Sequence, residues 1–374
     1  MSSAAIDQER GRPRTLMFSQ RNIRGKDPSR CPLYEFEDTI CQIDSAEILA
    51  PEPRERPMLY TKIANYLAEV SSIFVKSEVP KIKLQNSYDI LFVVCSFMKD
   101  LKDFDVVRNW KDCCRISICL VDEIWLEQLS VEKRFFNFLA QFDYIFLYYS
   151  QSVKAISNII GDKCFFLPPA VDAFLFCPYR DPPERFIDVY SYGRRSEVTH
   201  QKLLTMAKKN EIFYVYDSLS GIQVKNYKEH RYLLSNMAKR SRFLIVNPGL
   251  INDPKRGNQS EIGNRYFEGA SSGAILIGEY PATPEFEKLF SWPDAVIHLP
   301  FGSDQIDKII CEIDAQPGRE EKIHRNNVIW SLRHHDWVYR WETILKTVGL
   351  DPLPGLFERK QRLEDLSNIV EKGI

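Results

Sequence analysis

The feature that most constrains the fold is a repeated alternation of short apolar runs with helical patterns in both halves of the chain. In the first half, the runs at 89–96 and 115–121 are predominantly apolar, as expected for strands that are covered on both faces of a parallel sheet. The second half restarts the alternation at 187–192, and the run at 274–277 is again apolar. Strands that alternate with helices indicate βαβ units, so the sequence predicts an α/β fold with parallel sheets.

A proline-rich connection separates the two halves. Its prolines stand at positions 168, 169, 178, 182 and 183, and such a segment makes a stiff linker. A chain of 374 residues is too long for one ordinary core and suits two domains. We expect four parts: a disordered tail at 1–13, an N-terminal Rossmann-like domain at 14–177, a second Rossmann-like domain at 186–328, and C-terminal helices at 329–374 that pack back on the first domain.

The last of these parts is predicted to begin within one long helix at 326–348. Apolar side chains recur there at helical spacing, at Trp330, Trp337, Trp341, Ile344 and Leu345. A stripe of this kind indicates a helix face that packs against the body of the protein. We therefore expect the tryptophans to be core residues and not a platform for a sugar.

Composition and charge exclude several classes of protein. With 50 Lys and Arg against 51 Asp and Glu, the net charge is −1, so we expect no nucleic-acid partner. No apolar run reaches the roughly 20 residues of a transmembrane segment, and the first ten residues lack the apolar core of a secretory signal. The nine cysteines are odd in number and contain no C-x-x-C pair. These features predict a cytoplasmic protein with reduced thiols.

Residues 258–281 combine a polar loop, a short helix and a buried strand. Ser260 is expected to cap the start of this helix. At about 100° per residue, Glu261, Arg265 and Glu268 share one helix face, with the two carboxyl groups roughly 10 Å apart along the axis. The alternative is a solvated face on which Arg265 bridges two carboxylates.

A second candidate site lies at 190–196, where a predicted strand ends and a helix begins. Gly193 permits a tight turn, and the N-terminus of a helix favours an anion. Arg194 and Arg195 suit bidentate contacts with a diphosphate. The alternative is that both are solvated loop arginines.

Two motifs resemble a known family. The run E-I-G-N-R-Y-F-E-G-A-S-S-G at 261–273 resembles the donor-site helix of the two-domain (GT-B) glycosyltransferases of group 1, particularly the CgeB-like members. The segment at 171–178 is similar to the interdomain segment of the same family through Val171, Asp172, Phe176 and Pro178. The resemblance implies two Rossmann-like domains with parallel sheets that face each other across a cleft, the acceptor in the first and the donor in the second.

The resemblance also implies an activity, which is hexosyl transfer from a UDP-, GDP- or ADP-sugar to an acceptor hydroxyl with retention of configuration. Glu268 occupies the place of the glutamate that holds the ribose in this family. The second glutamate of the family would fall at Ser260, so the neighbouring Glu261 is the candidate catalytic residue next to the sugar. Arg265, on the same predicted helix face, is a further candidate for the donor site.

The Gly193-Arg194 pair occupies the place where the family contacts the donor phosphates. The lysine that usually accompanies this pair is missing, and Lys255 and Arg256 are candidates to replace it. These cations would offset the charge that develops on the departing diphosphate, so we expect neither a metal nor another cofactor.

The acceptor side is less marked in the sequence. Asp122 and Glu123 end a predicted central strand of the first half, and ligands of open α/β sheets bind outside the carboxyl ends of strands. Asp122 is therefore a candidate to orient or deprotonate the acceptor hydroxyl, with a strand-end turn residue as the alternative. The acceptor itself, whether a glycan, a lipid or a small molecule, is not indicated. A non-catalytic GT-B-like scaffold that binds a sugar or nucleotide, and a GT-B nucleotide-sugar epimerase, are the alternative functions.

Overall fold

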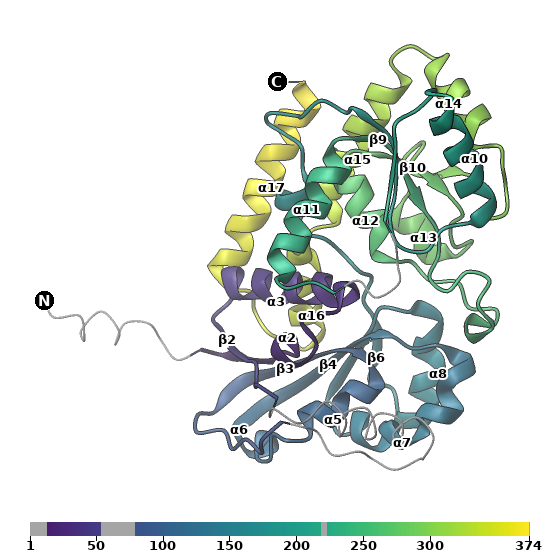
Figure 1. Cartoon of the computed structure of the whole chain (residues 1–374). Coiled ribbons are helices and arrows are strands. Elements are labelled where there is room, and N and C mark those ends of the chain that lie inside the picture. The colour runs from purple at the N-terminus through teal and green to yellow at the C-terminus, as the bar shows by residue number, and fades with distance from the viewer. Residues whose placement is uncertain (1–12, 54–78, 218–222, 374) are drawn as a thin grey trace, which may run out of the picture.

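The computed structural model describes residues 13–53, 79–217 and 223–373. The tail expected at 1–13 lies outside the described residues, except for Pro13. The described chain forms two halves, each built around a parallel sheet (Figure 1). The predicted α/β fold with two parallel sheets is confirmed.

The N-terminal sheet has the strand order β2-β1-β3-β4-β5-β6, and all its neighbouring strands are parallel. Its strands are β1 (Thr15–Phe18), β2 (Ala46–Leu49), β3 (Tyr88–Phe97), β4 (Cys114–Glu123), β5 (Tyr144–Leu147) and β6 (Cys164–Phe166).

The C-terminal sheet has the order β11-β10-β9-β7-β8 and is also parallel. Its strands are β7 (Ile187–Ser191), β8 (Tyr214–Tyr216), β9 (Ser241–Val246), β10 (Ile275–Gly278) and β11 (Ile297–His298). In each sheet the first strand in sequence lies between the second and the third. The order in which strands are added across the sheet therefore reverses at β1 in one sheet and at β7 in the other. Such a switch point is where doubly wound sheets bind their ligands.

Helices cover both faces of each sheet because successive strand residues point to opposite sides. In β3, the side chains of Ile90, Phe92 and Val94 belong to one core, and those of Leu91, Val93 and Cys95 belong to the core on the other face. The first core is covered by α3 (Cys31–Ile43), α15 (Arg319–His334), α16 (Trp337–Thr347) and α17 (Pro354–Lys372). The second is covered by α5 (Leu101–Phe104), α6 (Trp110–Cys113), α7 (Leu129–Leu139) and α8 (Ser150–Ile160).

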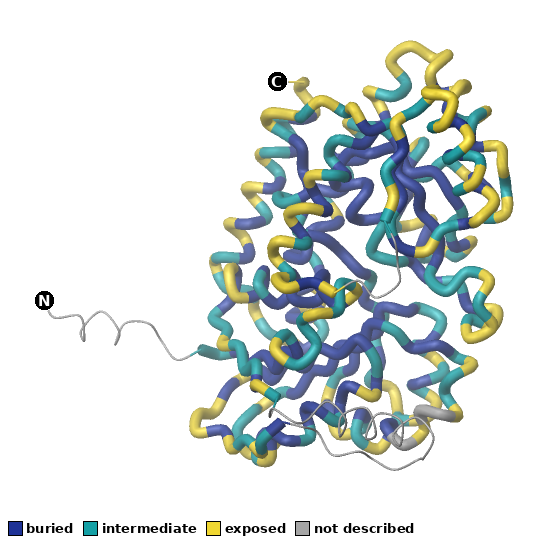
Figure 2. The backbone as a smooth tube through the Cα atoms, viewed as in Figure 1, coloured by how far each residue is buried: buried dark blue, intermediate teal, exposed yellow. Residues whose placement is uncertain are grey.

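The C-terminal sheet is enclosed in the same way, and Figure 2 shows its strands as a buried layer between partly exposed helices. One face is covered by α9 (Ala173–Phe176), α11 (Tyr227–Lys239), α12 (Asn264–Ser271) and α13 (Pro284–Leu289). The other is covered by α10 (Glu197–Lys208) and α14 (Ile306–Asp314). The remaining short elements are α2 (Arg21–Arg24), η1 (Pro28–Arg30), η2 (Met98–Asp100), η3 (Leu126–Gln128) and η4 (Pro254–Arg256).

The single helix predicted at 326–348 is wrong, because the chain forms α15 and α16 with a break between them. The break occurs at Asp336, whose carboxylate accepts a 2.9 Å hydrogen bond from the backbone of Val338 and so caps α16. The same carboxylate pairs with Arg359 of α17 at 2.7 Å. Capping and this ion pair favour a new helix start over continuation of α15.

The predicted tryptophan stripe is divided between two places. Trp337 and Trp341 are fully buried in the core that faces the N-terminal sheet, where Trp337 stacks on Phe36 of α3 with ring centres 4.7 Å apart. Trp330 belongs to α15 and stacks on Trp292 in the C-terminal half. The last helix, α17, contacts α3 and runs along the C-terminal half (Figure 1), so the end of the chain spans both halves.

Candidate functional site

A cavity of about 550 Å³ lies between the two halves. The N-terminal half contributes Asp122 and Glu123 from the end of β4, and Tyr149 from the turn after β5. The C-terminal half contributes residues 192–194 after β7 and Asn247 after β9. The cavity therefore faces the carboxyl ends of strands from both sheets, and it includes the β7–β9 switch point.

The turn after β7 is in contact with helix α12. Gly193 has a φ of +73°, which strains any other residue, and a Cβ atom at this position would lie 1.8 Å from Nη2 of Arg265 and would push this guanidinium aside. Nη1 of Arg265 donates a 3.1 Å hydrogen bond to the carbonyl of Arg194. The same guanidinium lies 5.5 Å from the centre of the Tyr192 ring. The two segments that the sequence singled out thus form one wall of the cavity.

The N-terminus of α12 opens onto this cavity. The expected start of the helix at Ser260 is wrong, since α12 begins at Asn264 with Gly263 as its N-cap and with no side-chain cap. Gly263 and Asn264 both line the cavity, and Oδ1 of Asn264 is buried without a hydrogen-bond partner. The uncapped N–H groups and the helix dipole favour an anion at this end of the helix.

Glu268 lines the cavity although only 3% of it is exposed. It is paired with Arg231 of α11, and it accepts a 2.5 Å hydrogen bond from the hydroxyl of Tyr192. A carboxylate has about four acceptor positions, so these two contacts leave Glu268 able to accept hydrogen bonds from a ligand.

Glu261 does not line the cavity and is not part of α12. Its carboxylate accepts hydrogen bonds from the backbone of Ser150 at 3.0 Å and of Gln151 at 3.1 Å, at the start of α8 in the N-terminal half. The side chain of Gln259 donates a third, at 2.8 Å. Burial raises the pKa of Glu261 to about 7, and these hydrogen bonds oppose the rise. Glu261 therefore joins the two halves, and these contacts explain why the helix does not extend back to Ser260.

Three further predicted donor-site residues also lie outside the cavity lining. The guanidinium of Arg195 lies 3.5 Å from Asp217 and 5.0 Å from the centre of the Tyr216 ring. Lys255 and Arg256 belong to η4, which contacts η3 of the N-terminal half. The predicted residues that do line the cavity are Asp122, Gly193, Arg194, Arg265 and Glu268.

Two adjacent carboxyl groups form part of the opposite wall. Burial and then the neighbouring Glu123 carboxylate raise the pKa of Asp122 well above its usual range. Burial also raises the pKa of Glu123, while a 3.2 Å hydrogen bond from the indole of Trp125 and the charge of Arg194 in the other half lower it. The Glu123 carboxyl group of the N-terminal half thus interacts with Arg194 of the C-terminal half.

Several cavity residues were not predicted from the sequence. Tyr192 directly precedes Gly193 in the predicted turn. Its place next to two candidate site residues could have identified it as a cavity residue. Trp125 and Tyr149 make an edge-to-face pair with ring centres 4.8 Å apart, which gives the N-terminal wall an aromatic corner. Arg231 lies within α11 and belongs to no sequence motif, so only the tertiary structure brings it to Glu268.

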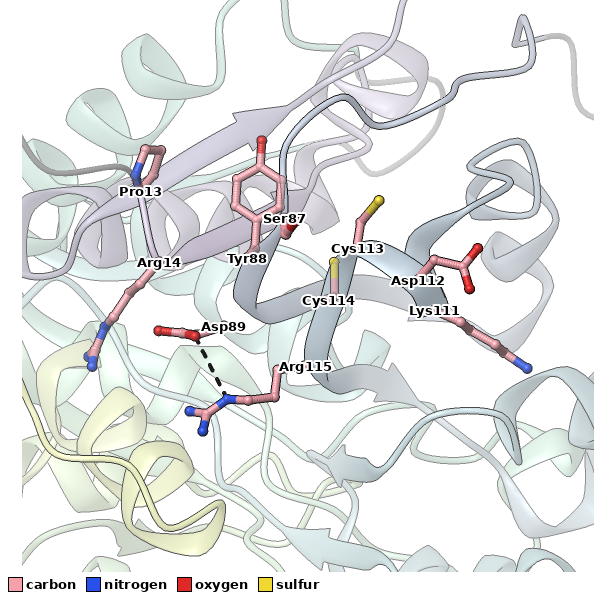
Figure 3. Close-up of a pocket in the computed structure, with 10 residues that line it drawn as sticks. All are labelled: Pro13, Arg14, Ser87, Tyr88, Asp89, Lys111, Asp112, Cys113, Cys114 and Arg115. Carbon is pink, nitrogen blue, oxygen red and sulfur yellow. Dashed lines mark ion pairs between the residues drawn. The ribbon is translucent and has the colours of Figure 1, made fainter.

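A wider hollow of about 740 Å³ lies at the opposite edge of the N-terminal sheet, at the amino ends of β1, β3 and β4 (Figure 3). Its lining includes Arg14, Cys113, Cys114 and the exposed pair of Asp89 and Arg115, whose charged atoms are 3.7 Å apart. It contains none of the predicted site residues. In the described part of the chain, no group of three or more His, Cys, Asp or Glu residues could hold a metal ion, and no helix is long and apolar enough to cross a membrane.

Comparison with known proteins agrees with this geometry. Residues 215–346, which contain α12 and Glu268, match the family described as glycosyl transferase-like. This part of the chain is therefore similar to that family, and the two parallel sheets together have the GT-B fold. No curated protein sequence matches the chain.

Solved structures with a similar fold cover both halves. An α-glucosyltransferase in complex with UDP-glucose and DNA containing an abasic site has a TM-score of 0.51 at 11% identity, over 90% of this chain and 99% of that one. A protein assigned as a UDP-N-acetylglucosamine 2-epimerase from Listeria monocytogenes has a TM-score of 0.50 at 9% identity, over 91% and 98%. TarM has a TM-score of 0.46 at 8% identity over 76% of this chain, which spans 57% of the length of TarM. At these identities the likeness to the first two structures establishes the GT-B fold alone.

Proposed function

We propose that the protein is a glycosyltransferase that moves a hexosyl group from a nucleotide-sugar to an acceptor hydroxyl, with retention of configuration and without a metal. Within the GT-B class, the sequence at 261–273 favours a CgeB-like member of group 1. The observation that supports this function most strongly is the convergence of Glu268, Arg194 and the uncapped N-terminus of α12 on one cavity.

In this proposal the donor lies against the C-terminal wall. The diphosphate occupies the space between the Gly193-Arg194 turn and the start of α12, where the helix dipole and the guanidinium of Arg265 favour negative charge. Glu268 accepts hydrogen bonds from the ribose hydroxyls. The same positive groups stabilise the charge that develops on the departing nucleoside diphosphate.

The acceptor, which is a glycan, a lipid or a small molecule, would lie against the N-terminal wall. We propose that Asp122 orients its hydroxyl group or takes its proton, because burial raises the pKa of this carboxyl group in the direction that suits a general base near neutral pH. All nine cysteines are free thiols, which supports a location in the reducing cytoplasm.

The proposal is tested by incubating the protein with UDP-, GDP- and ADP-sugars and analysing the products. UDP-glucose, the donor in the complex of the similar α-glucosyltransferase, is the first to try. Transfer or donor hydrolysis that is lost in Glu268→Ala and retained in Glu358→Gln, which changes an exposed carboxylate of α17, would support the transferase. Turnover to an epimeric nucleotide-sugar without any acceptor would favour the epimerase, and saturable binding without turnover would favour the scaffold.

A further inference from the structure

A buried group of charges crosses from one half of the molecule to the other. Arg231 of α11 donates to both carboxylate oxygens of Glu35 of α3, from Nε at 2.7 Å and from Nη2 at 3.3 Å. Through Nη1 the same guanidinium pairs with Glu268 of α12. The exposed fractions of the three side chains are 3%, 7% and 3%. One arginine therefore connects the N-terminal half to the carboxylate that lines the cavity.

Glu35 is held firmly in its own half. Its Oε1 accepts a 2.8 Å hydrogen bond from the indole of Trp337 and a 2.7 Å hydrogen bond from the backbone of Asp172, in the connection between the halves. Because these donors come from α16 and from the connecting segment, Glu35 has little freedom to follow a movement of Arg231. The position of the guanidinium thus depends on how α3 and α11 lie against each other.

The same arginine is also the charge partner of the buried Glu268 carboxylate. Arg231 is the charged partner of a carboxylate that is almost completely buried, and a buried charge without a partner is strongly unfavourable. Arg231 itself lines the cavity, and its guanidinium lies 4.8 Å from the centre of the Phe176 ring. Glu35, by contrast, does not line the cavity.

We propose that Arg231 is a positioning residue that holds the carboxylate of Glu268 toward the cavity and makes the affinity for the donor depend on the contact between α3 and α11. This inference rests on the proposed role of Glu268 in binding the ribose. Without Glu35, the guanidinium has Glu268 as its one carboxylate partner and is no longer held from the other side. A change at Glu35, outside the cavity and in the other half, is therefore expected to alter donor binding.

The test is isothermal titration calorimetry of the full chain with UDP, GDP and ADP. For the nucleotide that the wild type binds, we expect affinity to fall about tenfold or more in Arg231→Gln and severalfold in Glu35→Gln. In the double variant Arg231→Gln/Glu35→Gln, the two losses should not add, because Glu35 acts through Arg231. Arg240→Gln, which changes an arginine at the end of α11 that bonds to Asn236, is the matched control and should bind like the wild type.

A merely structural ion pair would give a different result. In that case Arg231→Gln and Glu35→Gln would lower the midpoint of thermal unfolding but bind the nucleotide with unchanged affinity, and the inference would be overturned. Arg231→Lys keeps the charge and allows the same comparison if Arg231→Gln does not fold. Absence of saturable binding of UDP, GDP and ADP by the wild type would instead overturn the proposed function, and this inference with it.

Discussion

The hydroxyl of Tyr192 donates a 2.5 Å hydrogen bond to Oε2 of Glu268. Tyr192 belongs to the turn after β7, and Glu268 lies on the second turn of α12. The bond therefore connects the segment proposed to hold the diphosphate with the carboxylate proposed to hold the ribose. Together with the contact of Arg265 to the Arg194 carbonyl, it makes the C-terminal wall of the cavity a single unit.

Arg194 and Arg195 are adjacent in sequence but lie in different surroundings. Arg194 lines the cavity, whereas Arg195 is packed against Tyr216 and paired with Asp217. Charge-assisted hydrogen bonds to a phosphate are strong, so Arg194→Ala should weaken UDP binding about tenfold, and Arg195→Ala should change it by less than about threefold. Calorimetric titration checks both values, and a larger loss in Arg195→Ala would contradict the proposed site.

The turn at Gly193 should not tolerate a side chain. Its φ of +73° is unfavourable for other residues, and an added Cβ would lie 1.8 Å from Arg265. Gly193→Ala is expected to cost about 1–3 kcal/mol of folding free energy and to weaken UDP binding by displacing Arg265. Gly302→Ala is the control, because no atom lies within 4 Å of its Cβ position. Thermal unfolding and calorimetric titration should distinguish the two variants. Equal stability and equal UDP affinity in both would contradict the proposed role of the Gly193 turn in the donor site.

Trp337 connects the end of the chain to the N-terminal half. It is fully buried, stacks on Phe36, and donates a hydrogen bond to Glu35. Trp337→Ala should reduce the free energy of unfolding by about 3–5 kcal/mol, measured by urea denaturation. Phe357→Ala removes a ring of α17 that is 55% exposed and should change stability by less than about 0.5 kcal/mol. Similar losses in both variants would show that Trp337 is not a core residue.

The raised pKa of Glu261 should make the stability of the protein depend on pH. Burial raises its pKa from 4.5 to about 7 in the folded chain, so between these values the native state binds more protons than the unfolded state. The free energy of unfolding should therefore fall as pH rises through this window. Glu261→Gln removes the titration and should flatten the dependence by on the order of 1–3 kcal/mol. Urea denaturation at pH 5 and pH 7.5 tests this, and the same slope in both proteins would count against it.

The strands were predicted well because their signal is local. The apolar runs at 115–121 and 274–277 correspond to β4 and β10 within about three residues at each end, since strands covered on both faces need apolar side chains at every position. Helix boundaries were predicted less well where distant partners decide them. Ser260 and Glu261 are held by the start of α8, and Asp336 by Arg359.

The same distinction applies to the cavity. Gly193, Arg194 and Glu268 were found because glycine at a turn and a carboxylate on a short helix are recognisable in a local motif. The contact between Glu35 and Arg231 joins residues 196 positions apart. Neither residue stands in a motif, and a glutamate or arginine within a helix is usually on its solvated face. The contact of Glu35 with Arg231 could therefore not be predicted from the sequence.

The proposed donor site is tested most directly by a crystal structure of the chain with UDP bound. In this site we expect the diphosphate between the Gly193-Arg194 turn and the N-terminus of α12, with the ribose hydroxyls within hydrogen-bond distance of the Glu268 carboxylate. A nucleotide bound elsewhere, such as in the hollow beside Cys113, or bound with its ribose turned away from Glu268, would contradict it.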